Sequence, residues 1–329
     1  MESHDIPGAL AGLAERAAGE LLGATPELTL LGHSQSLAFR AQHQGAHYLL
    51  RVHSPLTPPP DPEPFTCAGL LSECAWLEAL DAETDLVVQR PIARAGAGPV
   101  IELEDANGDA VPCTLVTWLD GEILTERRTE AQAAALGKVL ATLHVHAAGW
   151  TPPPGFSRPT YDRHWLHIAL GRLAGLEAAG VASAEHFAIL RDAAARLEAE
   201  LPVAADGEVG LIHADLHETN YVVLGDSVRP IDFSRCGFGP WLYDVAECIA
   251  HLHSGVRSHF LDAYSERRPL APDHVERIEA YLMLSTLECI GYHAPNPDER
   301  DYLERAIPLF ADNHFRAYLA REPFLFTLG

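Results

Sequence analysis

In the first 120 positions of the chain, hydrophobic residues gather in short runs bounded by turn residues, a pattern typical of β-strands. Turns are predicted at Gln44-Gly45 and Asn107-Gly108, and the proline-rich stretch 55–64 is expected to be a loop. Helical spacing occurs at residues 6–22 and 73–80. This part therefore predicts a mainly antiparallel sheet with one inserted helix. The expected strands lie within residues 28–53, where they include 37–41 and 46–52, and at residues 87–92, 100–103 and 111–118.

After Asp120-Gly121 the hydrophobic positions take up helical spacing, interrupted by three short apolar strands at residues 210–213, 221–224 and 228–232. A turn at Asp226-Ser227 joins the last two of these strands. We therefore expect an α+β protein with a small β-rich first lobe, residues 1–119, and a larger, mainly helical second lobe, residues 120–329. The expected helices are residues 131–147, 165–178, 184–201, 243–253, 259–264, 274–289 and 298–318.

The composition and charge of the chain limit which kinds of molecule it is expected to bind and where it is expected to be located. The 329 residues are 47% hydrophobic, enough to bury a core, and 46 acidic against 23 basic residues give a net charge of −23. Such a field repels phosphate backbones, so no nucleic-acid partner is expected. No run of about 18 apolar residues and no signal-peptide pattern occurs, so no membrane association is expected. Six cysteines without a C-x-x-C pair indicate reduced thiols and a cytoplasmic protein.

The most informative stretch is residues 211–220, in which His213, Asp215 and Asn220 have the spacing H-x-D-x-x-x-x-N. In a kinase catalytic loop, the Asp of this pattern accepts the proton of the attacking hydroxyl, and the Asn five residues later holds Mg²⁺. Asp232, after the next apolar strands, is placed to complete the metal site because Mg²⁺ prefers hard oxygen ligands. We therefore predict Asp215 as the catalytic base and Asn220 and Asp232 as metal ligands.

Two other interpretations of these residues are open. Asp and Asn are common in turns and at helix N-termini, so Asp215, Asn220 and Asp232 could be structural. Alternatively, His213, Asp215 and His217, at alternate positions, could hold zinc or iron in a metal hydrolase. The second alternative gives no role to Asn220 or Asp232.

These motifs resemble those of the aminoglycoside and choline phosphotransferase-like family, relatives of the protein kinases. The family pattern H-G-D-x-H-x-x-N is matched by residues 213–220 with Ala214 in place of glycine, and I-D-F/W-[DE] is matched by residues 231–234 with Ser234 in place of the acid. Residues 237–246 are similar to G-x-x-x-x-D-L-A, which implies that Asp244 braces the catalytic loop. The resemblance implies a protein-kinase-like two-lobe fold that uses ATP and Mg²⁺.

The resemblance also implies a cation on the third strand that contacts the α- and β-phosphates and pairs with a helix glutamate. The only lysine, Lys138, falls in the second lobe, so Arg51 is the candidate, with Glu73 as its carboxylate and Glu78 as the second choice. The phosphate-covering loop would be residues 32–36, including Ser34. Residues 118–121, beginning with Trp118, would form the hinge under adenine.

The expected function is an ATP-dependent phosphotransferase that acts on a hydroxyl of a small molecule. The acidic surplus would suit a cationic acceptor. The departures at Arg51, Ala214 and Ser234 leave open a catalytically degenerate, kinase-like nucleotide-binding regulatory protein, and a protein Ser/Thr kinase is a further alternative. The pattern gives no oligomeric state.

Overall fold

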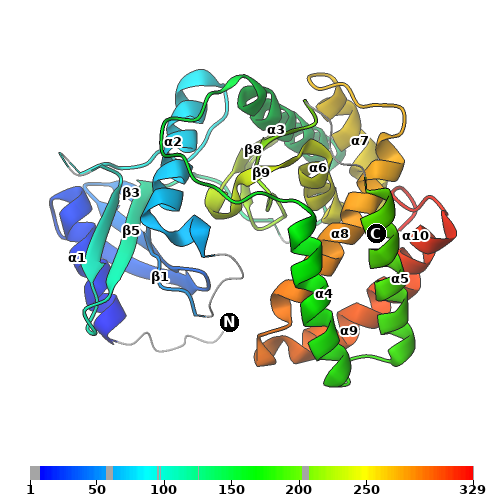
Figure 1. Ribbon diagram of the computed structural model, residues 1–329. Helices are drawn as coiled ribbons and strands as arrows, with labels where there is room; N and C mark the ends of the chain where they lie inside the picture. Colours follow the sequence, from blue (N-terminus) through cyan, green and yellow to red (C-terminus); the bar gives the residue numbers. More distant parts are fainter. Residues whose placement is uncertain are drawn as a thin grey trace. The chain divides into compact units, whose positions relative to one another are not determined.

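The computed structural model describes residues 8–56, 62–94, 96, 98–124, 126–201 and 207–328, shown in Figure 1. The chain divides into two compact units. The first comprises the chain up to Asp120 together with Thr151–Pro159, and the second comprises Gly121–Trp150 and the chain from Thr160 onward. Each unit is considered by itself.

The first unit is built on a five-stranded antiparallel sheet with strand order β1-β2-β3-β5-β4. Helix α2 is inserted between β3 and β4, as the sequence predicts. The elements are α1 (Gly8–Leu22), β1 (Glu27–His33), β2 (Leu37–His43), β3 (Ala46–Val52), the 3-10 turn η1 (Glu63–Phe65), α2 (Cys67–Glu83), β4 (Val100–Glu104) and β5 (Ala110–Thr117).

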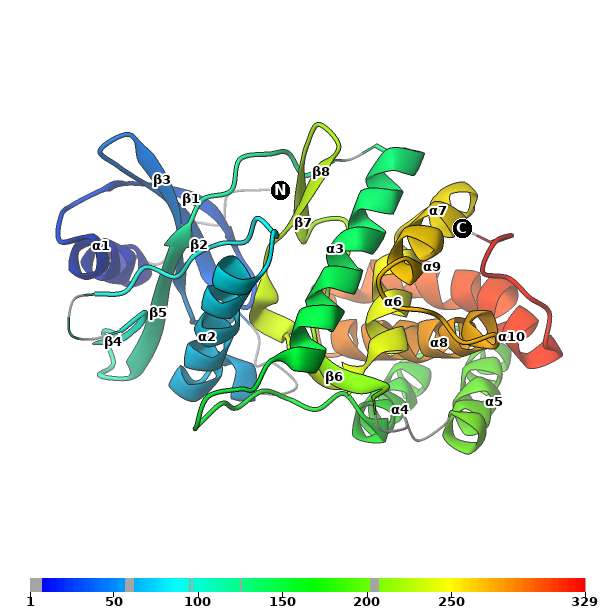
Figure 2. The same cartoon turned by 90° about the horizontal axis from the view of Figure 1, so that it is seen from above.

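Alternation along β2 creates the core of the first unit. Leu37, Phe39 and Ala41 are buried, with intermediate residues between them, and they pack with the apolar face of α1, including Leu13 and Leu21. Figure 2 shows α1 beside this sheet. Burial of this apolar surface stabilises the sheet.

Residues 151–159 belong to the first unit because polar groups tie them to α2. The backbone N–H of Ser157 donates to the hydroxyl of Ser72 at 2.8 Å, and the buried guanidinium of Arg158 donates to the carbonyl of Gly69 at 3.1 Å. Only glycine fits at position 69, because a Cβ there would lie 2.3 Å from the carbonyl oxygen of Glu63.

The second unit is mainly helical, with two small two-stranded antiparallel sheets, β6–β9 and β7–β8. Its long helices pack closely; Gly137 of α3 allows the backbone of α7 to approach, because a Cβ would lie 2.2 Å from the carbonyl oxygen of Phe260. The elements are α3 (Glu130–Gly149), α4 (Arg163–Ala178), α5 (Ala184–Glu200), β6 (Val209–Ile212), β7 (Tyr221–Leu224), β8 (Ser227–Pro230), η2 (Phe233–Arg235), β9 (Gly237–Pro240), α6 (Trp241–Ala250), α7 (Ser254–Ser265), α8 (His274–His293), η3 (Pro297–Glu299), α9 (Arg300–Phe310), the π-turn η4 (Ala311–Phe315) and α10 (Arg316–Ala320).

Most predicted elements are confirmed, and the α+β class is correct. The strand predicted at 87–92 is wrong: these residues make an isolated bridge, Pro91 with Val116, where proline has no N–H to continue a ladder. The helix predicted at 298–318 is confirmed in extent, but it is not one regular α-helix: it consists of η3, then α9, which contains Pro308, then a π-turn and α10. Parts of the predicted helix 6–22 and loop 55–64 lie outside the described residues. Among the described helices, none has the length and apolar character needed to cross a bilayer.

Candidate active site

The loop between β6 and β7, residues 213–220, is held by one buried carboxylate. Asp244, near the start of α6, accepts hydrogen bonds from the backbone N–H of His213 and of Ala214, each at 2.8 Å. Ala214 has a left-handed backbone, with φ of 60°. The bracing role implied for Asp244 is therefore confirmed, and Ala214 has a backbone conformation that glycine adopts more readily than alanine.

Asp244 is itself fixed by a buried histidine of α3. The Nε2–H of His144 donates to Asp244 Oδ2 at 2.9 Å, while Nδ1 of His144 accepts from the hydroxyl of Tyr264 on α7 at 2.8 Å. Burial lowers the pKa of His144, which keeps the imidazole neutral. Although burial opposes it, the hydrogen bond from His144 holds the pKa of Asp244 below its usual value. The loop is thus held by a chain of hydrogen bonds that links α3, α6 and α7.

Within the loop, Asp215 and Asn220 are in direct contact. The amide Nδ2 of Asn220 donates to the carbonyl oxygen of Asp215 at 2.8 Å and to its carboxylate Oδ2 at 2.9 Å. The same nitrogen lies 3.1 Å from Nε2 of His217. These contacts occupy the nitrogen side of the amide and direct its oxygen away from Asp215.

Asp232 lies next to this loop because the residue before it is bonded to both ends. Nε2–H of His213 donates to the carbonyl of Ile231 at 3.1 Å, and the N–H of Ile231 donates to the carbonyl of Asn220 at 2.9 Å. The strand β8 ends at Pro230, two residues earlier than the sequence predicts, and Asp232 has φ of 59°. Its side chain also accepts from the N–H of Ser234 at 3.4 Å and caps η2.

The electrostatic environment of Asp215 is unusual for a carboxylate. Its side chain is 19% exposed. Burial raises its pKa to about 7, the charges of Glu247 and Asp232 add to the rise, and Arg235 opposes it. A carboxyl with this pKa is matched to proton transfer near neutral pH. The acidic neighbours make the surroundings of Asp215 favourable for a positive charge.

Arg235 is a site residue that the sequence analysis missed. Its Nη1 donates to Asp215 Oδ1 at 3.2 Å, and its backbone carbonyl accepts from the hydroxyl of Tyr161 at 2.6 Å. The guanidinium carbon lies 5.8 Å from the centre of the Tyr161 ring. The signal was present in the sequence, because Arg235 follows directly after Ser234, the position at which the motif loses its acidic residue.

The histidines near Asp215 do not form a metal cluster. His213 is directed to the carbonyl of Ile231, and His251 pairs with Glu218 at 2.8 Å. Burial and the neighbouring His251 lower the pKa of His217 to about 4. Within the described ranges, no group of three or more His, Cys, Asp or Glu side chains is arranged to hold a metal ion. This counts against the hydrolase alternative.

In the first unit, the expected pair of Arg51 and Glu73 is present. Arg51 Nη1 on β3 lies 3.1 Å from Glu73 Oε1 on α2, and both side chains are at most 10% exposed. Glu78, the second choice, is not needed for this pair.

Ser34 lies in the turn between β1 and β2, where its carbonyl accepts from the N–H of Leu56. Trp118 follows β5 and has the guanidinium of Arg40 over its ring at 5.1 Å.

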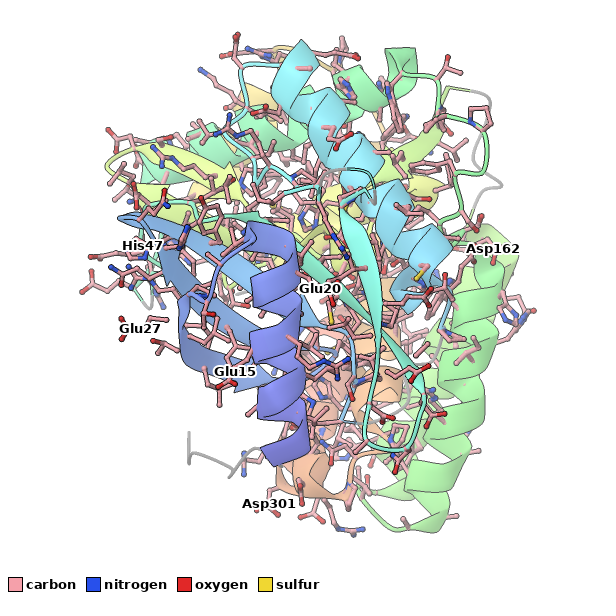
Figure 3. All side chains as sticks on the ribbon, turned by 90° about the vertical axis from the view of Figure 1, so that its left-hand side faces the viewer. Glu15, Glu20, Glu27, His47, Asp162 and Asp301 are labelled. Atoms are coloured by element: carbon pink, nitrogen blue, oxygen red, sulfur yellow. The ribbon has the colours of Figure 1, made fainter. Side chains whose placement is uncertain are left out.

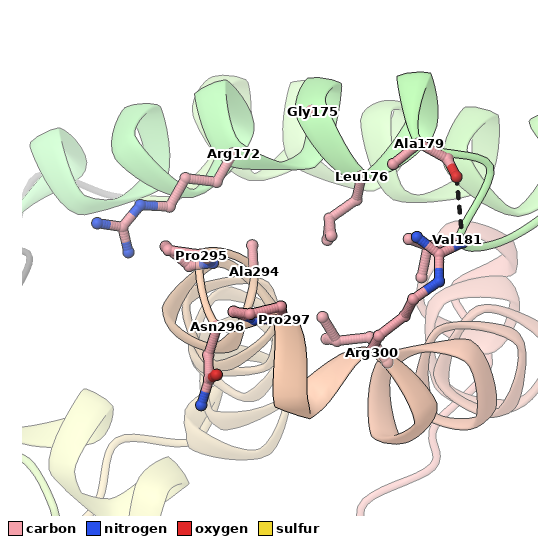
Figure 4. Close-up of a pocket in the computed structure, with 11 residues that line it drawn as sticks. Arg172, Gly175, Leu176, Ala179, Val181, Ala294, Pro295, Asn296, Pro297 and Arg300 are labelled. Carbon is pink, nitrogen blue, oxygen red and sulfur yellow. Dashed lines mark hydrogen bonds between the residues drawn. The ribbon is translucent and has the colours of Figure 1, made fainter. Parts of the chain in front are cut away.

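The second unit has two pockets that Asp215 does not line. The smaller, of about 360 Å³, lies between the end of α4 and residues 294–303 (Figure 4). Its two arginines already have partners, since Arg172 donates to the carbonyl of Gly291 and Arg300 to that of Ala179. The larger, of about 550 Å³, has residues of α4, α6, α8 and β9 in its wall.

Comparison with known proteins gives consistent matches. The sequence model of the phosphotransferase enzyme family matches residues 27–279. The structure of a microcompartment-associated aminopropanol kinase is 21% identical and covers 96% of this chain and 99% of its own, with a TM-score of 0.78.

Two other solved kinases show the same fold. An amicoumacin kinase in complex with AMP-PNP, Ca²⁺ and Ami is 18% identical, with 87% of this chain and 88% of its own covered at a TM-score of 0.69. A choline kinase from Cryptosporidium parvum Iowa II is 13% identical, with 90% and 88% covered at a TM-score of 0.61. No curated protein sequence gives a significant match. At these identities the likeness shows a protein-kinase-like fold.

Proposed function

The chain belongs to the phosphotransferase enzyme family, and on this premise we propose that it transfers the γ-phosphoryl group of ATP to a hydroxyl of a small, positively charged molecule. One observation carries the proposal: the carboxylate of Asp215 is held by Asn220 on one oxygen and by Arg235 on the other, in acidic surroundings. A carboxylate oriented in this way can accept the proton of an attacking hydroxyl.

Asp215 is the group to which we assign the chemistry on the acceptor. It orients the hydroxyl and takes its proton as the bond to phosphorus forms. In phosphoryl transfer most of the rate acceleration comes from positioning and from stabilisation of charge. The buried supports of the loop, Asp244 and His144, then act by keeping Asp215 in place.

The donor set of Asn220 and Asp232 fits Mg²⁺. An amide oxygen and a carboxylate are the hard ligands that this ion prefers, and the hydrogen bonds of the Asn220 nitrogen leave the amide oxygen for a metal. Mg²⁺ would supply neutralisation of the charge on the β- and γ-phosphates. The backbone hydrogen bond from Ile231 to the carbonyl of Asn220 brings Asp232, the next residue, close to Asn220. In this way the chain would present the two metal-binding oxygens.

We assign the nucleotide to the first lobe, residues 1–119, and catalysis and acceptor binding to residues 120–329. Arg51 would bind the α- and β-phosphates, held by its buried ion pair with Glu73. Arginine keeps the charge of the usual lysine and can bind oxyanions through two N–H groups. Ser34 would contact phosphate from the β1–β2 turn, and Trp118 would lie at the adenine.

A positively charged acceptor is supported by the charges near Asp215. Asp232 and the buried Glu247 both act on Asp215, and Arg235 is the cation that opposes them. Two similar structures are of kinases named for amino alcohols, aminopropanol and choline. An ammonium group beside the reacting hydroxyl would be attracted by these carboxylates. A cytoplasmic location is supported by the six cysteines, none of which forms a disulfide in the part of the chain that the structure describes.

The test is an ADP-release assay with a panel of amino alcohols and matched neutral alcohols. We expect turnover with an amino alcohol, and we expect Asp215→Asn to lower kcat by about two to four orders of magnitude while MgATP affinity is nearly unchanged. The exposed turn residue Asp226 supplies the control, since Asp226→Asn should leave the rate unchanged. Full activity of Asp215→Asn would show that Asp215 is not the catalytic base.

The substitutions at Ala214 and Ser234 support a second candidate, a kinase-like nucleotide-binding regulatory protein. This candidate predicts MgATP binding without ADP release for any small acceptor. Transfer to a protein serine or threonine would appear in the same assay as ADP release only on addition of a protein substrate.

A further inference from the structure

The smaller pocket of the second unit is formed where three segments meet. Its walls are the last two turns of α4, the turn that follows α8 and the first turn of α9, and it encloses about 360 Å³ (Figure 4). The apolar part of its lining includes Leu176, Val181, Pro297 and Leu303. A cavity of this volume is large enough for a small organic molecule.

The charged side chains in the wall are both arginines, Arg172 and Arg300. Among the described lining residues, Asn296 is the only other polar side chain, and there is no Asp, Glu or His. The acidic residues Asp301 (Figure 3) and Glu304 of α9 are exposed and lie outside the lining. Positive charge in an otherwise apolar wall favours an anionic ligand.

The two arginines differ in their partners. Arg300 forms an ion pair with Glu304, in which Nε lies 2.8 Å from Oε1, and its Nη2 donates to the carbonyl of Ala179 at 3.2 Å. Arg172 instead donates from Nη1 to the carbonyl of Gly291 at 3.0 Å, and no carboxylate in the part of the chain that the structure describes pairs with it. Nε and Nη2 of Arg172 can therefore donate two hydrogen bonds to an oxyanion.

Several hydrogen-bond acceptors of the wall are already engaged. The carbonyl oxygens of Gly175, Leu176 and Ala179 each accept a hydrogen bond of 3.0 to 3.2 Å. The amide oxygen of Asn296 accepts from the N–H of Asp298 at 3.1 Å. A ligand therefore meets N–H donors more readily than acceptors, which again favours an anion.

Gly175 leaves space at the wall. It lies inside the regular helix α4, where glycine is less favourable than alanine, and it shares one helix face with the lining residues Arg172, Leu176 and Ala179. A Cβ built at Gly175 would meet no heavy atom within 4 Å beyond its own stretch of helix backbone. Packing therefore does not require glycine at this position, whereas a large side chain there would occupy the cavity.

The length of the cavity fits an elongated ligand. Figure 4 shows Arg172 and Arg300 at opposite ends, with Leu176 between them. Arg172 and Ala179, which accepts from Arg300, are separated by about 10 Å along the axis of α4. A ligand with its charged group at Arg172 would lay its apolar body along Leu176, where burial of apolar surface contributes to binding.

We propose that this pocket binds a small organic carboxylate with an apolar body, and that Arg172 pairs with the carboxylate group. Arg300, whose charge is already compensated by Glu304, closes the far end. The site goes beyond the proposed phosphotransfer and does not depend on it, since none of Asp215, Asn220 and Asp232 lines the pocket.

Binding is tested on the full chain by calorimetry in a carboxylate-free buffer, with 4-phenylbutyrate and its neutral counterpart 4-phenyl-1-butanol. We expect the carboxylate to bind at least about tenfold more tightly, equivalent to about 1.4 kcal/mol. Arg172→Gln keeps a donor for the carbonyl of Gly291 and should abolish this preference. Arg305→Gln, at an exposed position of α9 outside the lining, is the matched control and should retain it.

The position of the probe is tested with Gly175→Phe, which fills the cavity. Both probes should bind at least about tenfold more weakly, while the free energy of unfolding should not fall, because a glycine inside a helix is replaced. Gly171→Phe is the control in the same helix. A Cβ at Gly171 also meets no heavy atom within 4 Å, but this residue does not line the pocket, so binding should be unchanged.

Equal affinity for the carboxylate and the alcohol, an unchanged preference in Arg172→Gln, or unchanged binding in Gly175→Phe would each overturn the site. Addition of MgATP should leave the affinity for 4-phenylbutyrate unaltered, and displacement of the probe by MgATP would place it at the nucleotide and also overturn the site. None of these measurements requires turnover, so failure of this inference is distinguishable from failure of the proposed phosphotransfer.

Discussion

Ala214 shows how the backbone conformation of a single residue reflects the shape of the loop at residues 213–220. Its φ of 60° lies in the left-handed region, where a Cβ is unfavourable by about 1–2 kcal/mol. Two hydrogen bonds to Asp244, one from Ala214 itself and one from His213, keep the turn in this conformation. These two hydrogen bonds therefore hold the loop in a turn that is unfavourable for alanine.

Ala214→Gly is expected to stabilise the protein. Relief of the left-handed strain exceeds the added flexibility of the unfolded chain, so the free energy of unfolding should rise by about 0.5–1 kcal/mol. Chemical denaturation measures it. Ala134→Gly, inside the regular helix α3, is the matched control and should destabilise by a similar amount. A loss of stability in Ala214→Gly would contradict the account of the turn.

Arg235 contacts the carboxylate of Asp215, which we propose as the catalytic base, so it is expected to act on Asp215 and not only on folding. Arg235→Gln should lower kcat by about tenfold or more, because Asp215 loses the charged donor that orients one of its oxygens. Arg235→Lys, which keeps the charge, should recover part of that loss. The KM for ATP should be nearly unchanged in both variants. Equal kcat values for the Gln and Lys variants would show that the charge has no role.

At the scale of elements, the buried group of His144, Asp244 and Tyr264 joins α3, α6 and α7. Because burial lowers the pKa of His144, the folded protein binds no proton there, whereas the unfolded chain binds one below about pH 6.5. The lowered pKa of Asp244 adds stability that is present above the ordinary pKa of aspartate and is lost at lower pH.

The stability that His144 contributes is therefore expected to fall as the pH falls from about 7 to about 5, by up to about 1.4 kcal/mol per pH unit for the one proton that its imidazole takes up on unfolding. Urea denaturation over this range measures the slope. His144→Gln has no titratable ring and should show a lower stability at neutral pH with a shallower slope. An unchanged slope in His144→Gln would contradict the neutral state of the buried imidazole.

The elements that the sequence predicts well are those with a strong period and clear turn residues. The hairpin of β2 and β3 is an example, since Gln44 and Gly45 both take positive φ at the turn. Strand β9, Gly237–Pro240, was missed because two glycines and a proline carry no strand signal. It forms through pairing with β6, and a Cβ at Gly239 would lie 2.7 Å from the side chain of Ile212.

In the candidate site, too, the features that are local in sequence were predictable and those that depend on long-range contacts were not. The order and spacing of Asp215, Asn220 and Asp232 were readable, because the loop and the following strands are local in sequence. The pocket with Tyr243 and Glu288 in its wall was not, since it depends on contacts between residues distant in the chain, such as Tyr243 with Glu288. Sequence periodicity carries no information about such contacts.

For the whole molecule, the net charge of −23 and the acids around Asp215 point to the same class of acceptor. A negative field raises the local concentration of cations, while the anionic nucleotide needs its own cationic partners to bind. Mg²⁺ at Asn220 and Asp232 and the guanidinium of Arg51 are the partners that we propose. The account therefore depends most on the metal-nucleotide assignment.

The most direct test of that assignment is a titration of the protein with Mn²⁺ and ATP, followed by the loss of the free Mn²⁺ signal in electron paramagnetic resonance. We expect nucleotide-dependent Mn²⁺ binding that weakens at least about tenfold in Asp232→Ala, because a carboxylate ligand is removed. Asp226→Ala, in the exposed turn between β7 and β8, should bind as the unaltered protein does. Equal Mn²⁺–ATP affinity in Asp232→Ala and Asp226→Ala would contradict the proposed catalytic centre.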